Sequence, residues 1–322
     1  MTEPNRATTE SGGHDPWEIV QTARHPLRPY ALDYFQRLLE RFVELHGDRR
    51  FGDDGAMVTG VGFLEEYPVA VVGQQKGRTA AERRERNFGM ARPEGYRKAM
   101  RIMQMAARFG RPIITLIDTP GADCLEGSEG RGISEAIAAN QRDMFALPVP
   151  VISVVIGEGG SGGAIGIGVG DRVYMLEYTY YSVIMPEACA AILWRDPKLN
   201  REAAQALKLT GNDALEMGLI DGIIPEPPGG AHMDYEAAAL ALKEQLLAAL
   251  GELRGKTGEE LMATRWEKFR KMGAPVSRRE AGGERREVEI GAGGRTRTGM
   301  RGEPRRILSP LRLPIPPLRH RD

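Results

Sequence analysis

Apolar positions along the chain form short unbroken runs and longer stretches with helical spacing. Residues 112–117 and 150–156 are unbroken runs, which is typical of strands buried on both faces. Val-rich segments between Gly and Pro predict two adjacent strands at 56–64 and 68–73. Shorter strands are expected at 172–176, 182–185 and 219–224. Helical spacing predicts helices over 31–46, 94–109, 133–147, 186–194, 235–250 and 259–272, and another could start within 164–169.

Strand pairs that alternate with helices indicate an α/β fold. The pattern supports one domain over residues 16–275, with its core at 30–255 and helices at its C-terminal end. Residues 1–15 are polar and are expected to be a disordered N-terminus. Residues 276–322 are rich in Arg, Gly and Pro and are expected to be a disordered tail.

The charge balance limits the classes of function. The 322 residues include 44 Lys and Arg and 44 Asp and Glu, so a chain-wide attraction to nucleic acid is not expected. Residues 277–322 hold 12 Arg against 6 acidic residues, so neutrality does not extend to the tail. Two cysteines cannot supply a four-thiolate zinc site, and no metal site is expected. The chain has no 18-residue apolar run and no signal-like apolar stretch at its start, which favours the cytoplasm over a membrane or secretion.

Glycine is concentrated after the second buried run. Eight of the 14 residues at 157–170 are glycine, and a smaller turn, Asp118-Thr-Pro-Gly-Ala122, follows the first buried run. Glycine permits close backbone approach. A turn that leads into a helix also presents free N–H groups, with the positive end of the helix dipole behind them. Two such turns predict a pair of backbone donors that stabilise an oxygen as it becomes negative.

Two nucleotide-binding motifs resemble these turns but fit them less well. A phosphate-binding loop requires G-x-x-x-x-G-K-[ST], and the glycine segment contains no Lys. A dinucleotide fingerprint fits the letters Gly157-x-Gly-x-x-Gly, but no βαβ unit with a suitably spaced acidic residue supports it. The alternative that both turns are only tight strand-to-helix corners stays open.

A basic segment at residues 76–101 has nine positive and three negative side chains. It either binds a phosphate-bearing ligand or acidic partner, or forms a solvated helix face. An unusual turn at Asn87-Phe-Gly-Met90 favours the first. The histidines lack the spacing of paired metal ligands, and Cys124 is interpreted as a packing residue. No protein base stands out, which suits a reaction whose substrate or cofactor brings its own base.

Several ordered motifs identify a family. They are His25-Pro-Leu-Arg-Pro-Tyr30, Gly73-Gln-Gln-Lys-Gly-Arg78, Arg86-Asn-Phe-Gly-Met90, Pro93-Glu-Gly-Tyr-Arg-Lys-Ala99, Ile114-Thr-Leu-Ile-Asp-Thr-Pro-Gly-Ala122, Ser134-Glu-Ala-Ile-Ala138, Val155-Ile-Gly-Glu-Gly-Gly-Ser-Gly-Gly-Ala164, Gly168-Val-Gly-Asp171, Tyr181-Ser-Val-Ile184, Pro186-Glu187, Ile192-Leu-Trp194 and Ile224-Pro-Glu-Pro-Pro-Gly-Gly-Ala-His232. Over roughly residues 17–250 the chain resembles the α subunits of bacterial acetyl-coenzyme A carboxylase carboxyltransferase.

The resemblance implies a crotonase-like spiral of β-β-α units with an N-terminal helical segment and peripheral C-terminal helices. It implies transfer of a carboxyl group from carboxybiotin to acetyl-CoA, which gives malonyl-CoA, the first committed step of fatty acid biosynthesis. The biotin is carried by a separate biotin carboxyl carrier protein, with biotin carboxylase in the larger complex. The α subunit mainly holds the carboxybiotin and is active only with a β subunit, which carries a zinc ribbon and completes an α2β2 assembly.

Site residues follow from the resemblance together with the two turns. Carboxybiotin releases CO2, and the biotin nitrogen can then deprotonate acetyl-CoA. Backbone N–H groups of Ala122, Gly163 and Ala164 are the candidate donors to the ureido oxygen, and Gly121 and Gly162 allow its approach. The remaining expected carboxybiotin contacts are Gly159, Gly160, Ser161, Lys76 and Arg78.

The first turn departs from the family pattern. The family continues Asp-Thr-Pro-Gly-Ala with Tyr-Pro-Gly and then Glu-Glu-Arg-Gly-Gln, whereas here Asp123-Cys124 follows. A carboxylate beside a developing anion is unfavourable. The alternatives are therefore a shifted loop, or a paralogous subunit that acts on another acyl-CoA, acts as a biotin-dependent decarboxylase, or only binds a partner through its basic segments. The tail after Pro275 has no recognised counterpart in the family.

Overall fold

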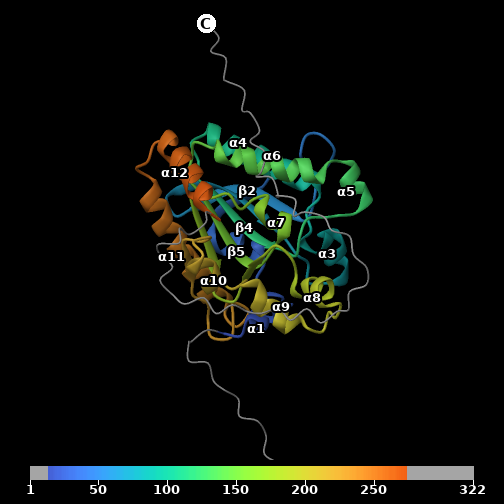
Figure 1. Cartoon of the computed structure of the whole chain (residues 1–322). Coiled ribbons are helices and arrows are strands. Elements are labelled where there is room, and N and C mark those ends of the chain that lie inside the picture. The colour runs from blue at the N-terminus through green and yellow to red at the C-terminus, as the bar shows by residue number, and fades with distance from the viewer. Residues whose placement is uncertain (1–13, 274–322) are drawn as a thin grey trace, which may run out of the picture. The chain divides into compact units, whose positions relative to one another are not determined.

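One mixed β-sheet organises residues 14–273, the part of the chain that the computed structural model describes (Figure 1). Its strands lie in the order β1-β2-β3-β4-β5-β6-β8, with β7 paired to β5. The first three strands are antiparallel and the others pair in parallel. Their bounds are β1 Glu40–Glu44, β2 Met57–Leu64, β3 Tyr67–Gln74, β4 Ile113–Thr119, β5 Val151–Gly160, β6 Arg172–Leu176, β7 Tyr180–Ser182 and β8 Gly222–Ile224.

Helices cover both faces of the sheet (Figure 1). They are α1 Pro16–Ala23, α2 Ala31–Leu38, α3 Ala80–Glu85, the 3₁₀ turn η1 Asn87–Gly89, α4 Pro93–Arg108, α5 Glu126–Gly130, α6 Ile133–Phe145, α7 Ser161–Ile165, α8 Pro186–Trp194, α9 Asn200–Leu207, α10 Gly211–Glu216, α11 Tyr235–Leu253 and α12 Gly258–Lys271. The predicted tail at 276–322, and residues 1–13 of the predicted N-terminal segment, lie outside the described residues.

Strand β5 shows how the two faces share the core. Its side chains alternate, so Val151 and Val155 pack into the cluster formed with α4 and α6, while Ile152 and Val154 pack into the cluster formed with α2 and α11. Every residue of β4 and β5 is buried. The unbroken apolar runs therefore correctly predicted two central strands.

The helix expected over residues 31–46 is wrong beyond Leu38. The chain becomes extended at Leu39, and Glu40–Glu44 forms β1, which pairs antiparallel with β2. The apolar spacing continues past the turn, but the edge of β2 offers hydrogen bonds that a longer helix would leave unmade. Tertiary pairing therefore overrides the local periodicity.

The glycine loop expected after residue 156 is also wrong in its first half. Strand β5 continues through Gly160, where Glu158–Gly160 pair with β7. Beyond the strand, α7 begins at Ser161 rather than at Ala164. The strand expected at 182–185 lies earlier, at Tyr180–Ser182, and the one expected at 219–224 is limited to Gly222–Ile224.

Candidate functional site

The first turn follows the buried end of β4. Thr119 Oγ1 accepts a hydrogen bond from the Gly121 N–H at 3.1 Å and donates one to the Gly121 carbonyl at 2.5 Å. This closed loop orients the backbone that continues into Ala122. Among residues 14–273 no acceptor takes the Ala122 N–H, so this donor is available to a bound oxygen.

The second turn joins β5 to α7 at Ser161. The φ of Ser161 is +50°, a left-handed conformation that costs a non-glycine residue about 1–3 kcal/mol. No side chain caps the start of α7, and the first N–H groups of a helix have no intrahelical acceptor. Ser161 is exposed and Gly162 partly exposed, whereas Gly163 and Ala164 are buried. The reachable donors of this turn are therefore at Ser161 and Gly162.

The two turns touch each other backbone to backbone. A Cβ on Gly163 would lie 2.5 Å from the Gly121 carbonyl carbon and 2.7 Å from the Ala122 nitrogen. A Cβ on Gly160 would overlap the Pro120 carbonyl. Real Cβ atoms do not approach backbone this closely, so only glycine permits this contact. The structure thus brings together the two turns that the sequence singled out.

Two cavities open on either side of the start of α7. A cavity of about 360 Å³ is lined by Gly121, Ala122 and Cys124 together with Ser161 and Gly162. A second cavity of about 430 Å³ shares Ser161, Gly162 and Val183 with the first and is mostly apolar. Its other lining residues are Gln141, Phe145, Ile165, Gly168, Val169, Val173, Tyr181, Ser182, Leu219, Phe269 and Met272.

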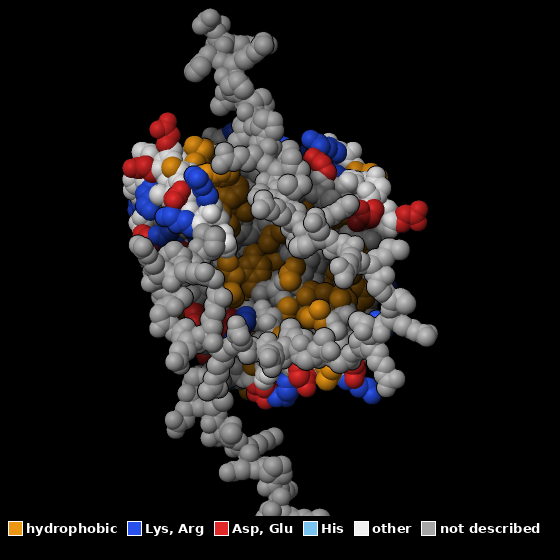
Figure 2. All heavy atoms as spheres, viewed as in Figure 1, with side chains coloured by type: hydrophobic (Ala, Val, Ile, Leu, Met, Phe, Trp, Pro, Cys, Tyr) orange, Lys and Arg blue, Asp and Glu red, His pale blue; other side chains and the backbone are white. Residues whose placement is uncertain are grey.

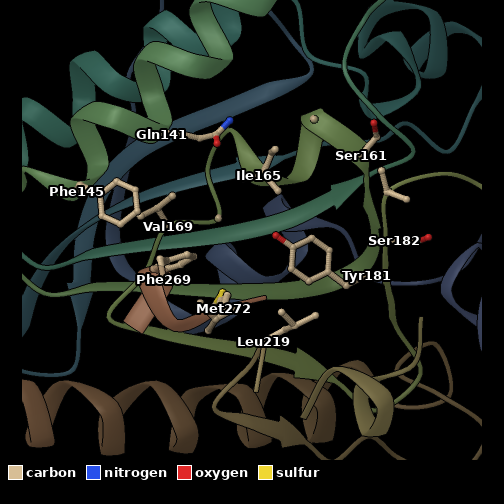
Figure 3. A pocket seen from close by; sticks show the side chains of 14 residues that line it. Gln141, Phe145, Ser161, Ile165, Val169, Tyr181, Ser182, Leu219, Phe269 and Met272 are labelled. Carbon is tan, nitrogen blue, oxygen red and sulfur yellow. The ribbon is translucent and has the colours of Figure 1, made fainter. Parts of the chain in front are cut away.

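The apolar cavity is visible as a hollow with hydrophobic side chains at its base (Figure 2). Figure 3 shows the ring of Tyr181 between Ile165 and Leu219, with Ser161 at one side. Burial raises the pKa of Tyr181 to about 12, so its hydroxyl stays protonated and can donate a hydrogen bond. A mostly apolar wall with few polar groups is typical of a small-molecule site.

A cluster of buried charge lies beneath the two turns. Lys76 Nζ is 2.7 Å from Asp118 Oδ1 and 2.7 Å from Glu158 Oε1. Arg24 Nε lies 2.7 Å from Glu158 Oε2, which also accepts the Tyr180 hydroxyl at 2.5 Å. Asp118 Oδ1 further accepts the Glu158 N–H at 2.9 Å. These contacts link the carboxyl ends of β4 and β5.

The charges in this cluster depend on one another. Burial opposes ionisation of Glu158, but Lys76 and Arg24 outweigh it and lower the pKa of Glu158 to about 2. Burial raises the pKa of Asp118, although Lys76 favours its charged form. Burial alone would lower the pKa of Lys76, but Asp118 and Glu158 raise it above its usual range. Lys76 is therefore a firmly protonated internal cation.

The other expected contacts lie away from the cavity surfaces. Lys76 is engaged in internal ion pairs, and Arg78 pairs with Asp33 at 2.6 Å and stacks over Tyr30. Gly159 and Gly160 are buried in β5. None of these residues lines either cavity, and neither do Gly163 and Ala164. Of the expected contacts, Gly121, Ala122, Ser161 and Gly162 reach a cavity.

The unusual Asp123 has partners of its own. Its carboxylate accepts the Ser128 hydroxyl at 2.7 Å and the Leu125 N–H at 3.3 Å, and Arg92 Nε lies 3.7 Å away. The Asp123 N–H bonds to the Ala91 carbonyl. These bonds compensate the negative charge of Asp123, which the sequence placed unfavourably close to a proposed oxyanion donor. Cys124 beside it is exposed, not packed.

Sequence reasoning did not find the roles of Glu158 and Tyr181. Glu158 is the one acidic residue in the otherwise uncharged and buried strand β5. A single carboxylate in such a run could have indicated a buried ion pair. Tyr181 was noted only as part of a family motif. Its place in the cavity depends on β7 pairing with β5, which local patterns do not encode.

The described residues hold neither a metal-binding cluster nor a membrane-spanning helix. Over 14–273, no group of three or more His, Cys, Asp or Glu residues is arranged to hold a metal ion. No helix within the same span is both long and apolar enough to cross a membrane.

The sequence is similar to one known protein family over most of its length. A family model described as acetyl co-enzyme A carboxylase carboxyltransferase-like matches residues 7–273. The chain is 57% identical over 256 residues to a protein of Geobacter sulfurreducens, covering 80% of each chain. It is 54% identical over 261 residues to one of Staphylococcus epidermidis, covering 81% of this chain and 83% of the relative. Both relatives are named acetyl-coenzyme A carboxylase carboxyl transferase subunit alpha.

Solved structures confirm the crotonase-like α/β fold. A Pseudomonas malonate decarboxylase hetero-tetramer in complex with coenzyme A matches with a TM-score of 0.59 and 18% identity, over 73% of this chain and 91% of that one. Transcarboxylase 12S with methylmalonyl-coenzyme A bound matches with a TM-score of 0.56 and 18% identity, over 70% of this chain. The chain covers only 41% of the transcarboxylase chain.

Proposed function

Because the chain belongs to the family of acetyl-coenzyme A carboxylase carboxyltransferase α subunits, we propose that it transfers a carboxyl group to acetyl-CoA to form malonyl-CoA. The carboxyl group comes from carboxybiotin on a biotin carboxyl carrier protein, which biotin carboxylase loads. The enzyme is a transferase that works with a β subunit in an α2β2 assembly. In this proposal the β subunit holds a zinc ion and the complex acts in the cytoplasm.

The observation that supports this proposal most is the convergence of two backbone turns on one cavity. The Ala122 N–H and the start of α7 border the same space. Loss of the carboxyl group from carboxybiotin places negative charge on the ureido oxygen. Pre-oriented N–H groups stabilise such an oxygen, and removing one donor from such a site typically costs about 10²–10³-fold in rate.

The composition of the cavities agrees with chemistry in which the substrate supplies the base. No histidine or lysine among residues 14–273 lines either cavity. The acidic residues that line the smaller one are Glu129 and Asp123, and the Asp123 carboxylate already accepts hydrogen bonds from Ser128 and Leu125. Lys76, which was expected to contact carboxybiotin, is paired with Asp118 and Glu158 instead. The chain's own residues therefore bind and orient the ligand, and the proton moves between acetyl-CoA and biotin.

The apolar cavity offers the second half of the binding surface. Its exposed residues include Ile165 and Val183, which are 41% and 76% exposed in the isolated chain. We propose that the bicyclic ring of biotin and a face of the β subunit cover these side chains. Apolar surface of this kind is stabilised when a partner removes it from water.

Reconstitution tests the function directly. The full chain is mixed with the β subunit of the same organism, carboxybiotin and acetyl-CoA, and malonyl-CoA is measured by mass spectrometry. We expect product only when both subunits are present. The function is contradicted if the subunits do not co-purify and the mixture yields no malonyl-CoA.

Two variations address the alternatives raised by Asp123. Propionyl-CoA replaces acetyl-CoA in one set, and malonyl-CoA alone is supplied in another to detect decarboxylation. Asp123→Tyr restores the side chain usual in the family. We expect acetyl-CoA to remain the preferred acceptor in both forms, because the Asp123 carboxylate is held by Ser128 and Leu125. A preference for propionyl-CoA, or rapid decarboxylation, would favour a paralogous activity.

A further inference from the structure

Gln74, the last residue of β3, connects the two turns through one side chain. It is fully buried. Its Oε1 accepts the Asp118 N–H at 3.1 Å, and its Nε2 donates to the Gly163 carbonyl at 2.8 Å. One amide therefore bonds both to the strand end that leads into the first turn and to the helix that follows the second.

The Gly163 carbonyl lies outside the hydrogen-bond ladder of α7. The Gly166 N–H bonds to the Gly162 carbonyl and the Ile167 N–H bonds to the Ala164 carbonyl. The carbonyl between them takes its hydrogen bonds from side chains instead. Tyr96 Oη from α4 donates at 3.1 Å, in addition to Gln74. Two buried donors thus fix the orientation of a peptide group in the first turn of α7.

This peptide group lies at the contact between the turns. Gly163 abuts the Gly121–Ala122 peptide so closely that no Cβ fits. A displacement of the Gly163 carbonyl would therefore shift α7 relative to the first turn. The separation between the Ala122 N–H and the Gly162 N–H depends on this contact, and both residues line the same cavity.

We propose that Gln74 is a positioning residue that sets the distance between the two backbone donor turns. The proposal rests on the carboxyltransferase function proposed above. An amide is the side chain suited to this task, because it both accepts from an N–H and donates to a carbonyl without carrying charge. An ionised glutamate accepts but cannot donate, and methionine offers no donor.

The chain supplies a matched control in the next residue. Gln75 is also buried, but its amide accepts the Leu32 N–H at 2.9 Å and donates to the Lys76 carbonyl at 2.8 Å. It anchors α2 rather than the turns. Gln75→Met and Gln74→Met therefore make the same chemical change at neighbouring buried sites, and only the second releases the Gly163 carbonyl.

Steady-state kinetics of the α–β complex provide the first measurement. We expect Gln74→Met to lower kcat by about 10–100-fold while KM for acetyl-CoA stays within about threefold, because the donors are misplaced rather than lost. Gln74→Glu should lower kcat at least as far. Tyr96→Phe, which removes one of the two donors to Gly163, should lower kcat by about 3–10-fold. Gln75→Met should keep kcat within about threefold.

Hydrogen–deuterium exchange of the isolated subunit provides a second measurement that does not need activity. Peptides that cover residues 161–168 should exchange about tenfold faster in Gln74→Met than in the wild type, and Gln75→Met should leave them unchanged. The exchange measurement tests the positioning role of Gln74 separately from the proposed carboxyltransferase function. A wild-type complex that makes no malonyl-CoA contradicts the proposed function, while exchange still tests the positioning.

Wild-type kcat together with wild-type exchange in Gln74→Met would overturn the positioning role. An equal loss of kcat in Gln75→Met would also overturn it, because the effect would then follow from buried amide loss in general. If Gln74→Met does not fold, Gln74→Glu and Tyr96→Phe carry the same test. Wild-type kcat in both of these variants would reject the proposal.

Discussion

Strand β5 has a cluster of buried charge at each end, and the two ends differ in whether the neighbouring backbone N–H groups are paired. At its start, Arg265 from α12 is fully buried and pairs with Asp171 at 2.7 Å. The guanidinium also donates to the carbonyls of Met144, Leu147 and Val149. All of its nitrogen atoms have partners, and the cluster lines neither of the two cavities.

At its other end, the cluster of Lys76, Asp118 and Glu158 supports backbone that is not fully satisfied. The charged side chains have close partners. Directly above them, the Ala122 N–H has no acceptor among the described residues, and the start of α7 has no cap. Backbone donors that open to a cavity and have no protein acceptor are free to bind water or a ligand oxygen.

The difference indicates that one end of β5 has a structural role and the other end a functional role. The start of β5 joins α12 to the sheet and contributes stability. The end of β5 uses buried charge to hold two turns whose donors remain open to a ligand. Mutations at the two ends should therefore separate stability from activity, and each prediction below tests that separation.

The largest effect is expected at the structural end, for Arg265→Met. This change leaves the Asp171 carboxylate, which is 3% exposed, without its cation and leaves three carbonyls without donors. Removing one partner of a buried ion pair costs about 3–5 kcal/mol. We expect denaturant unfolding to show a loss of this size, with kcat of the remaining folded complex near that of the wild type.

Arg265→Lys is the matched control for the lost charge. It keeps a cation but cannot reach the same set of acceptors with a planar fork. Its loss of stability should lie between wild type and Arg265→Met. A specific fall in kcat at unchanged stability would contradict the division between the two ends.

The next effect is expected at the functional end, for Gly163→Ala. The added methyl group would lie 2.5 Å from the Gly121 carbonyl carbon, so the turns must separate. We expect kcat of the α–β complex to fall by about 10²–10³-fold, which is the loss typical of removing one oxyanion donor. The free energy of unfolding should fall by about 1–3 kcal/mol because of the overpacking.

Gly162→Ala provides the steric comparison. Its added Cβ would meet only Ile137 Cδ1, at 3.8 Å, so it should change the free energy of unfolding by less than about 1 kcal/mol. Equal destabilisation by the two substitutions would show that the contact between the turns is not what makes position 163 sensitive.

Parts of this site could be predicted because they depend on local sequence. Two unbroken apolar runs, each followed by a glycine turn, placed Ala122 and Gly162 at the ends of neighbouring parallel strands. The donor-bearing turns therefore needed no tertiary information beyond strand pairing. The same locality explains why α4 and α11 were predicted within a few residues of their bounds.

The rest depends on contacts between distant segments. Lys76 was expected to bind ligand because its charge was visible in the sequence, whereas its partners Asp118 and Glu158 are 42 and 82 residues away. Strand β1 continues a helical pattern and is a strand only because β2 pairs with it. Burial of Gly163 likewise follows from packing against the first turn, and Ala164 is buried in the core cluster formed with α4 and α6.

The smallest effect expected is the pH dependence that Glu158 contributes to stability. Its pKa is about 2 in the folded chain and 4.5 ordinarily, so the charged form favours folding. This contribution is fully present above about pH 4.5, amounts to about 3 kcal/mol at most, and disappears as pH falls towards 2. The free energies of unfolding of wild type and Glu158→Gln should therefore differ most at neutral pH, and the difference should shrink by up to about 1.4 kcal/mol per pH unit below 4.5.

Asp118 contributes a pH dependence of the opposite sign, since burial raises its pKa. Because wild type and Glu158→Gln both contain Asp118, taking the difference between them reduces this contribution. A gap that stays constant from pH 6 to 3 would mean that Lys76 and Arg24 do not hold Glu158 ionised, and that the functional end is supported by packing alone.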